Sequence, residues 1–153
     1  MIRNDLADAL LGAVHGAQSR LRGLDDAAAA RHASAGRWNA KEILGHLIDS
    51  ASNNHQRFVR AQYTDDLQFP KYEQNTWVDI QRYDEAEWSV LVDLWESYNR
   101  HLAYVIRNMP TEALHSTCVV GENAPASLQF LVEDYLRHMQ HHLRQIEERT
   151  AAR

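Results

Sequence analysis

Two histidines near the end of the chain, His138 and His142, lie four residues apart in the segment HMQHH. On a helix this spacing puts both side chains one turn apart on the same face, where they can bind a single metal ion. His141 is rotated by about 60° from His138 and about 100° from His142 on the helical period, so we place it at the flank. The pair predicts a metal site, and the structural alternative is a pair of core histidines bonded to their neighbours.

A metal site needs a third ligand, because two imidazoles alone hold an ion weakly. His46 lies in the segment KEILGHLIDSASNNH, at the margin of an apolar stripe that includes Ile43 and Leu47. Three histidines from two helices leave coordination positions open to water or substrate, as in catalytic rather than closed structural sites. Polar residues placed to orient the imidazoles by accepting a ring N–H bond are Asp49, Asn53, Asp134 and Gln145.

Two reactions suit such a site, and in both the three histidines would be ligands rather than bases. In the first, the ion stabilises a low-molecular-weight thiol as its thiolate near pH 7 and presents it to an electrophilic carbon. In the second, the ion lowers the pKa of a bound water, and Asp49 or a neighbouring carboxylate shuttles the proton. A third alternative is a non-catalytic bundle whose metal is structural.

Other residues with reactive or bulky side chains give weaker signals. Cys118 is the single cysteine and has no neighbour that would activate it, which favours an ordinary, partly buried thiol. Tyr72 and Trp77 lie in a long connection and could line a pocket. The remaining histidines are expected to be surface or structural residues: His15, His32, His55, His101 and His115.

The elements that must position these residues are helices. Apolar residues recur at three- and four-residue spacing between only three prolines and six glycines, which predicts an all-α chain. Asn39 and Glu42 have the spacing of a capping box, and Glu85 and Glu87 would lie in the first turn of a helix that begins near Asp84. We expect long helices at about residues 2–24, 39–63, 84–109 and 127–149, with a short helical piece in DDAAAARHAS.

The connections between these helices predict the topology. Residues 64–83 form a connection of about 20 residues, longer than usual between helices and therefore functional or a crossover. Residues 111–125 could include a short extended piece, but no second segment is strong enough to predict a sheet. Four long helices with one long middle connection predict a four-helix bundle that need not be simple up-down-up-down.

Length and charge limit the class of protein. A chain of 153 residues with 44% hydrophobic residues fits one globular domain, residues 1–153. A net charge of −5 without a dense basic run argues against nonspecific nucleic-acid binding. The apolar runs are too short for a bilayer span and the first segment carries acids, so we expect no membrane segment and no signal peptide. One cysteine excludes an intrachain disulfide and fits a cytoplasmic protein.

Three segments together resemble the DinB-like (DinB/YfiT) superfamily: WNAKEILGHLID from Trp38, FPKYEQNTW from Phe69, and SLQFLVEDYLRHMQHHLRQI from Ser127. The similarity covers essentially the whole chain in order. It implies an up-up-down-down four-helix bundle, and a divalent ion (zinc, nickel or iron) at positions that here are His46, His138 and His142. Frequent homodimers are also implied, and the Trp and Leu content of the third helix allows a second apolar face for one.

The resemblance leaves the reaction open. Members of this superfamily include transferases that use bacillithiol or mycothiol, thiol-dependent isomerases and proposed hydrolases. A small-molecule substrate is therefore expected, with a low-molecular-weight thiol as the first candidate. The third helix and the loops match only loosely, so no substrate contacts are transferred to this sequence.

Overall fold

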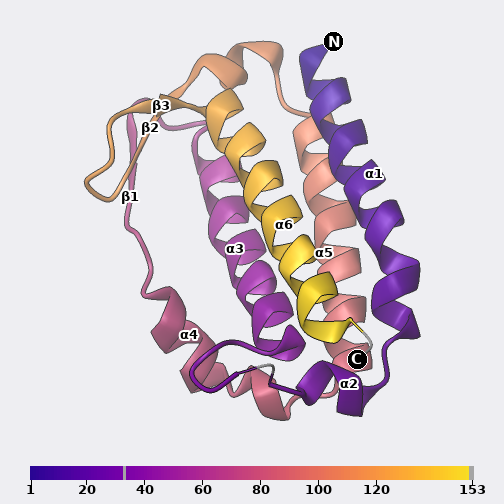
Figure 1. Ribbon diagram of the computed structural model, residues 1–153. Coiled ribbons are helices and arrows are strands. Elements are labelled where there is room, and N and C mark those ends of the chain that lie inside the picture. Colours follow the sequence, from indigo (N-terminus) through magenta and orange to yellow (C-terminus); the bar gives the residue numbers. More distant parts are fainter. Residues whose placement is uncertain (33, 152–153) are drawn as a thin grey trace.

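The computed structural model describes residues 1–32 and 34–151, and four long helices form its body (Figure 1). These are α1 (Ile2–Gly23), α3 (Ala40–Arg60), α5 (Trp88–Arg107) and α6 (Leu128–Thr150). The shorter elements are α2 (Asp26–Ala30), β1 (Leu67–Phe69), α4 (Gln74–Gln81), η1 (Tyr83–Glu85), η2 (Thr111–His115), β2 (Thr117–Val120) and β3 (Ala126–Ser127). The expected four-helix bundle is confirmed, with a small sheet added at one end.

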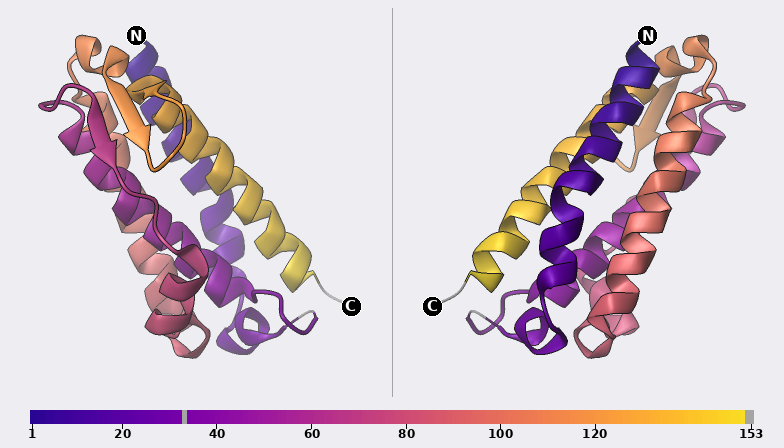
Figure 2. Two further views of the ribbon diagram at one scale, coloured as in Figure 1. Left: turned by 90° about the vertical axis from the view of Figure 1, so that its left-hand side faces the viewer. Right: turned by 90° about the vertical axis from the view of Figure 1, so that its right-hand side faces the viewer.

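The long crossover determines how the helices run. In Figure 1, α1 and α6 run downwards while α3 and α5 run upwards, so the connection after α3 returns the chain to the bottom before α5 begins. The directions along the chain are down, up, up and down, and Figure 2 shows the same arrangement from two other sides. One consecutive pair of helices is therefore parallel, at the crossover, whereas the up-up-down-down order implied by the resemblance has two such pairs. Helix α1 packs mainly against α5, and α3 packs against both α5 and α6. The segments that contain the three predicted histidine ligands therefore belong to neighbouring helices, α3 and α6.

Helix α3 begins with the expected capping box. The Asn39 side chain accepts from the backbone N–H of Glu42 at 2.9 Å, and the Glu42 carboxylate accepts from the backbone N–H of Asn39 at 3.1 Å. Ile43, Leu47 and Phe58 are buried in the core. A second buried face of α3 is polar and faces the site, with members His46, Asp49, Ser50, Asn53, Asn54 and Arg57.

Helix α5 begins at Trp88 rather than near Asp84. Glu85 lies in η1 and Glu87 is the N-cap residue, so neither acid lies in the first turn. The helix takes its cap from another element, because the Asp26 carboxylate of α2 accepts from the backbone N–H of Trp88 at 2.9 Å. The two residues of this contact are 62 positions apart, so no local sequence pattern reveals it. The sequence therefore predicted too early a start for α5.

Residues 111–125 contain the short extended piece that the sequence allowed, and it belongs to a sheet that the sequence did not predict. Strand β2 pairs in parallel with β1, with Leu67 opposite Cys118, and antiparallel with β3, with Thr117 opposite Ser127. The partner β1 comes from the long connection, about 50 residues earlier, and local sequence patterns do not reveal such a pairing. Cys118 is buried in this sheet, consistent with a structural thiol. Gly121 makes the turn after β2 with a positive φ of 58°.

The core lies between the four helices. Trp95 and Leu102 of α5 are fully buried, and the indole N–H of Trp88 donates to the carbonyl of Leu21 at 2.7 Å. Among the described residues, no helix is long and apolar enough to span a membrane.

Candidate metal centre

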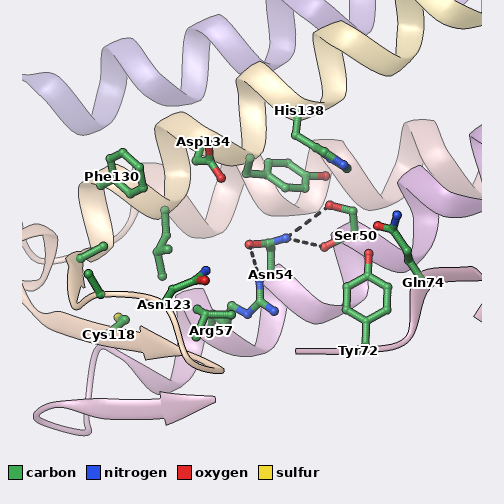
Figure 3. A pocket seen from close by; sticks show the side chains of 15 residues that line it. Ser50, Asn54, Arg57, Tyr72, Gln74, Cys118, Asn123, Phe130, Asp134 and His138 are labelled. Carbon is green, nitrogen blue, oxygen red and sulfur yellow. Dashed lines mark hydrogen bonds between the residues drawn. The ribbon is translucent and has the colours of Figure 1, made fainter. Parts of the chain in front are cut away.

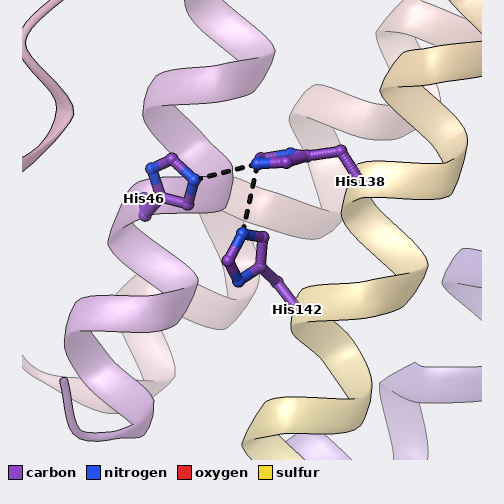
Figure 4. Close-up of side chains that lie close together, drawn as sticks. All are labelled: His46, His138 and His142. Carbon is purple, nitrogen blue, oxygen red and sulfur yellow. Dashed lines mark hydrogen bonds between the residues drawn. The ribbon is translucent and has the colours of Figure 1, made fainter. Parts of the chain in front are cut away.

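The three predicted histidines converge between α3 and α6 (Figure 4). Nε2 of His138 lies 3.1 Å from Nε2 of His46 and 3.1 Å from Nε2 of His142. The candidate ligand atoms of all three lie within 4.8 Å of one another. Within the described part of the chain, this triad is the one group of at least three His, Cys, Asp or Glu residues arranged in this way.

The donor set fits a divalent ion. Tetrahedral zinc with Zn–N bonds of about 2.0–2.1 Å places its ligand nitrogens roughly 3.3 Å apart, close to the two separations of 3.1 Å at Nε2 of His138. Nε2 of His138 offers either one proton or one lone pair, so it cannot make separate linear hydrogen bonds to both neighbours. A cation that accepts a lone pair from each imidazole satisfies all three nitrogens at once.

Burial keeps these imidazoles neutral. Desolvation, with smaller repulsion from His138 and His142, lowers the pKa of His46 to about 3. Desolvation, and then the charge of His142, lowers the pKa of His138 to about 4. Burial also lowers the pKa of His142, although its hydrogen bond to Gln145 opposes this. At pH 7 the triad therefore presents unprotonated nitrogens, the form that binds metal.

Gln145 orients one imidazole of the triad, and Trp38 packs near another. Nδ1 of His142 and Oε1 of Gln145 are 2.7 Å apart, so Gln145 accepts a ring N–H as expected. This contact places the ring proton on Nδ1 and leaves Nε2 free for a metal. The ring of Trp38 lies 5.1 Å from that of His46. His141 is exposed beside the site, with its Nε2 3.4 Å from Nε2 of Gln145, as expected for a flanking residue.

Asp49, Asn53 and Asp134 do not accept a ring N–H from the triad, contrary to expectation. Oδ1 of Asp49 accepts from the Tyr83 hydroxyl at 2.7 Å and from the Gln81 amide at 2.9 Å. The Asn53 amide donates to the backbone carbonyl of Asp49, and Asp134 pairs with Arg137. Among the described residues, Nδ1 of His46 is buried without a hydrogen-bond partner.

The reason for the different role of Asp49 lies one turn earlier. Gly45 has no Cβ, and a Cβ there would overlap the ring of Tyr83. Tyr83 can therefore lie against α3, where its hydroxyl donates to Oδ1 of Asp49. Burial raises the pKa of Asp49 despite its two hydrogen bonds, and its Oδ2 is buried without a partner among the described residues.

Cavities border the triad on both sides. One, of about 250 Å³, extends from His138 to the sheet and is lined by Tyr72, Arg57 and Cys118 among others (Figure 3). The other, of about 280 Å³, lies beside His142 and is lined by Trp38, Arg37, Gln145 and Arg149 among others. Gln74 lines both cavities. Tyr72 thus lines a pocket as expected, whereas Trp77 instead packs against its ring at 5.1 Å.

Sequence reasoning missed Asn54 and Arg57 in the polar wall of the first cavity. Ser50, Asn54 and Arg57 follow His46 at intervals of four, four and three residues, so all four share one face of α3. That helical spacing was the signal that could have identified them.

The protein is thus a four-helix bundle in which three neutral imidazoles converge as a candidate metal centre. The sequence matches the DinB superfamily over residues 10–146, and the chain belongs to that superfamily.

One relative in sequence is described as metal-dependent. "Putative metal-dependent hydrolase BH0277" of Halalkalibacterium halodurans (strain C-125) is 25% identical over 111 residues. That alignment covers 72% of this chain and 64%, less than two thirds, of the relative.

Two solved structures show the same fold. YfiT from Bacillus subtilis, described as a probable metal-dependent hydrolase with an unusual four-helix bundle topology, has a TM-score of 0.86 at 16% identity. The match covers 97% of this chain and 85% of that one. A mycothiol-dependent maleylpyruvate isomerase has a TM-score of 0.74 at 13% identity, covering 94% of this chain and 59% of that one.

Proposed function

We propose that the protein is a metal-dependent transferase that uses a low-molecular-weight thiol of the bacillithiol or mycothiol type. His46, His138 and His142 would hold one divalent ion per chain, either zinc, nickel or iron. The observation that carries the proposal is the convergence of three Nε2 atoms at the place where two cavities adjoin. In this proposal residues 1–153 act as one domain, because the ligands come from both α3 and α6.

The residues of the chain prepare the site for a cation. A bound divalent ion would supply Lewis acidity that lowers the pKa of a coordinated thiol or water. Burial keeps the imidazoles unprotonated, and Gln145 holds the ring of His142 in one tautomer. Gln74 stands at the junction of the cavities, where it can contact a ligand in either one.

Two cavities favour transfer over hydrolysis. A thiol transfer must seat two organic reactants next to one centre, whereas hydrolysis needs one organic substrate and water. The spaces beside His138 and beside His142 provide separate places for a thiol and for its electrophilic acceptor. The fold shared with a mycothiol-dependent isomerase supports a thiol as one of the two.

Hydrolysis is the second candidate, and the descriptions of the Halalkalibacterium relative and of YfiT favour it. Here Asp49 would act as the proton shuttle. Its raised pKa brings it closer to the range in which a carboxyl group exchanges protons near neutrality. Tyr83 and Gln81 would hold Oδ1 in place, which leaves Oδ2 for proton transfer.

Parallel activity assays separate the candidates. Zinc-, nickel- and iron-loaded protein would be supplied with mycothiol or bacillithiol and a panel of electrophiles, and separately with a panel of esters and amides. We expect thiol-dependent conjugation that is lost in His142→Ala. Ester or amide turnover without thiol would favour the hydrolase. If neither panel exceeds metal-free protein, both fail and the non-catalytic bundle with a structural metal remains.

The proposal extends to the cellular setting and the assembly. A reduced thiol as cosubstrate fits the cytoplasm, where free cysteines such as Cys118 persist. We expect a homodimer and no nucleic-acid partner, the latter from the net charge of −5.

A further inference from the structure

We propose that Arg57 anchors the carboxylate of a small organic substrate in the cavity beside His138. The inference rests on the proposed function, because it assigns this cavity to the electrophilic reactant. It adds a substrate class and a specificity residue that the metal site alone does not define.

Arg57 is a buried cation that pairs with no anion in the part of the chain that the structure describes. The residue is 8% exposed, and no carboxylate of the described residues lies within 4.0 Å of its guanidinium. Among the described residues, the guanidinium makes one hydrogen bond, from Nη1 to Oδ1 of Asn54 at 3.3 Å, and its Nε is buried without an acceptor. The ring of Phe69 lies 5.2 Å from Cζ. Burying an unpaired guanidinium is unfavourable, so a bound anion would relieve this cost.

Further donors line the same cavity (Figure 3). The Tyr72 hydroxyl makes no hydrogen bond to the described residues, and burial raises the pKa of Tyr72 to about 12, so it remains a donor. Ser50 Oγ accepts from the Asn54 amide at 3.3 Å, which leaves its own hydrogen available. With Arg57, these groups form a cavity wall that can donate to a ligand.

The charge of the lining favours a carboxylate over a phosphate. Arg57 is the one basic side chain other than His138 among the lining residues, and Asp134 is the one acidic residue. Asp134 pairs with Arg137 at 3.1 Å and is not within ion-pair distance of Arg57. A single guanidinium matches a monoanion in a bidentate pair, whereas a dianion near Asp134 would be repelled.

The dimensions indicate a small substrate. A volume of about 250 Å³ lies below the roughly 300–1,000 Å³ of drug-sized ligand pockets. Arg57 follows His46 by three helical turns, roughly 16 Å along the axis, and its long side chain reaches back over part of that distance. The carboxylate would therefore lie several bonds from the reacting atom.

Calorimetric titration with benzoate, and with its neutral isostere benzamide, tests the proposal. Metal-free and zinc-loaded full-length protein would both be titrated, with inorganic phosphate as a third probe. We expect benzoate to bind both forms more tightly than benzamide or phosphate does. Arg57→Met should weaken benzoate binding about tenfold or more, the effect of losing a hydrogen bond to a charged group. Arg60→Met, an exposed arginine on the same helix, is the matched control and should leave it unchanged.

Each contrary result has a distinct meaning. Equal binding of benzoate and benzamide, or a change below twofold in Arg57→Met, would overturn the proposal. Tighter binding of phosphate would overturn the carboxylate assignment. Benzoate binding only to zinc-loaded protein, unaffected by Arg57→Met, would mean that the carboxylate contacts the metal instead. If Arg57→Met does not fold, Tyr72→Phe and Arg57→Lys replace it, and several-fold weaker benzoate binding is expected in both.

The two proposals fail separately. Zinc binding by the triad is measured in the same samples, together with a His142→Ala variant that keeps Arg57. Benzoate binding that persists in metal-free His142→Ala would support the anion site even if the chain bound no zinc. Zinc binding without benzoate binding would leave the metal centre intact and remove the role of Arg57.

Discussion

At the scale of single residues, the site depends on Nε2 of His138, because the two other imidazoles both approach this atom. His46 is buried and the two other rings are half-buried, so their Nε2 atoms have lost solvent without gaining separate hydrogen bonds. Such a cluster is disfavoured unless a shared cation compensates for the lost hydration.

Metal content gives the most direct prediction. Untagged protein should contain about one divalent ion per chain by elemental analysis. His142→Ala should lose it, and His46→Ala should retain much less, because two imidazoles bind weakly. His141→Ala, which alters an exposed neighbour, should keep full occupancy. Full occupancy in the His46→Ala, His142→Ala double variant would show that the ligands are wrongly assigned.

The contact between Gln145 and His142 gives a second prediction. Gln145→Leu keeps the shape of the side chain but removes the acceptor at 2.7 Å from Nδ1. Zinc affinity, measured by competition with a chromophoric chelator, should fall about 10- to 100-fold. Gln129→Leu, which removes a contact to Glu133 on the same helix, is the control and should bind as wild type does. Equal affinities for both variants would contradict an orienting role.

The pH dependence of metal-free stability follows from the lowered pKa values. Unfolded histidine takes up a proton near pH 6.5, whereas folded His138 and His46 do so only near pH 4 and pH 3. The unfolded state binds more protons between these values, so the free energy of unfolding should fall as the pH drops below about 6.5. Each histidine contributes at most about 1.4 kcal/mol per pH unit.

Urea denaturation with a chelator present, at pH 7.5 and at lower pH, measures this slope. His138→Gln should flatten it, while His15→Gln, at an exposed position, should not. A slope identical in all three proteins would contradict neutral imidazoles in the folded state.

How much of the site the sequence predicts depends on the contacts involved. The His138 and His142 pair and the nearby Gln145 are local on one helix, so their spacing suffices. Arg57 and Tyr72 become neighbours only after the connection folds back over α3. Asp49 shares the His46 face by spacing, yet its orientation is set by Tyr83, 34 residues later.

At the scale of elements, the contrast is between helices and strands. Apolar periodicity predicts all four long helices, because each buries one continuous stripe. The strands have two to four residues, and the third long helix, α5, separates β1 from its partner β2 along the sequence. Neither composition nor periodicity indicates so distant a pairing.

Gly45 tests how α3 is fitted against Tyr83. A methyl group at Gly45 would overlap the buried Tyr83 ring, so Gly45→Ala should destabilise the protein by about 1–3 kcal/mol, as overpacking does. Gly16→Ala on α1 meets no atom within 4 Å and should be stabilising by up to about 1 kcal/mol through helix propensity. Thermal or urea unfolding distinguishes the two. Gly45→Ala as stable as wild type would mean that Tyr83 does not pack there.

At the scale of the whole molecule, the outer side of α5 carries three exposed apolar side chains. Trp88 and Trp95 point into the core and so do not form the second apolar face that the composition of this helix suggested. The exposed apolar side chains of this helix are instead Val90, Leu94 and Tyr104, with exposed fractions of 54%, 46% and 66%. Exposed apolar residues indicate an interaction surface where they form one continuous patch, which is the condition that a dimer through this side of α5 would have to meet.

If this face joins two copies of the chain, a charge at its centre should separate them. Leu94→Arg should shift the mass measured by light scattering or sedimentation from dimer to monomer, because an isologous contact brings the two introduced arginines close together. Ile80→Arg on α4 alters another exposed apolar residue, 74% exposed against 46% for Leu94, and should leave the dimer intact. Zinc content should not change in either variant, since the triad lies between α3 and α6. A wild-type protein that is monomeric across a dilution series would contradict the dimer, and a dimer unaffected by Leu94→Arg would place its interface elsewhere.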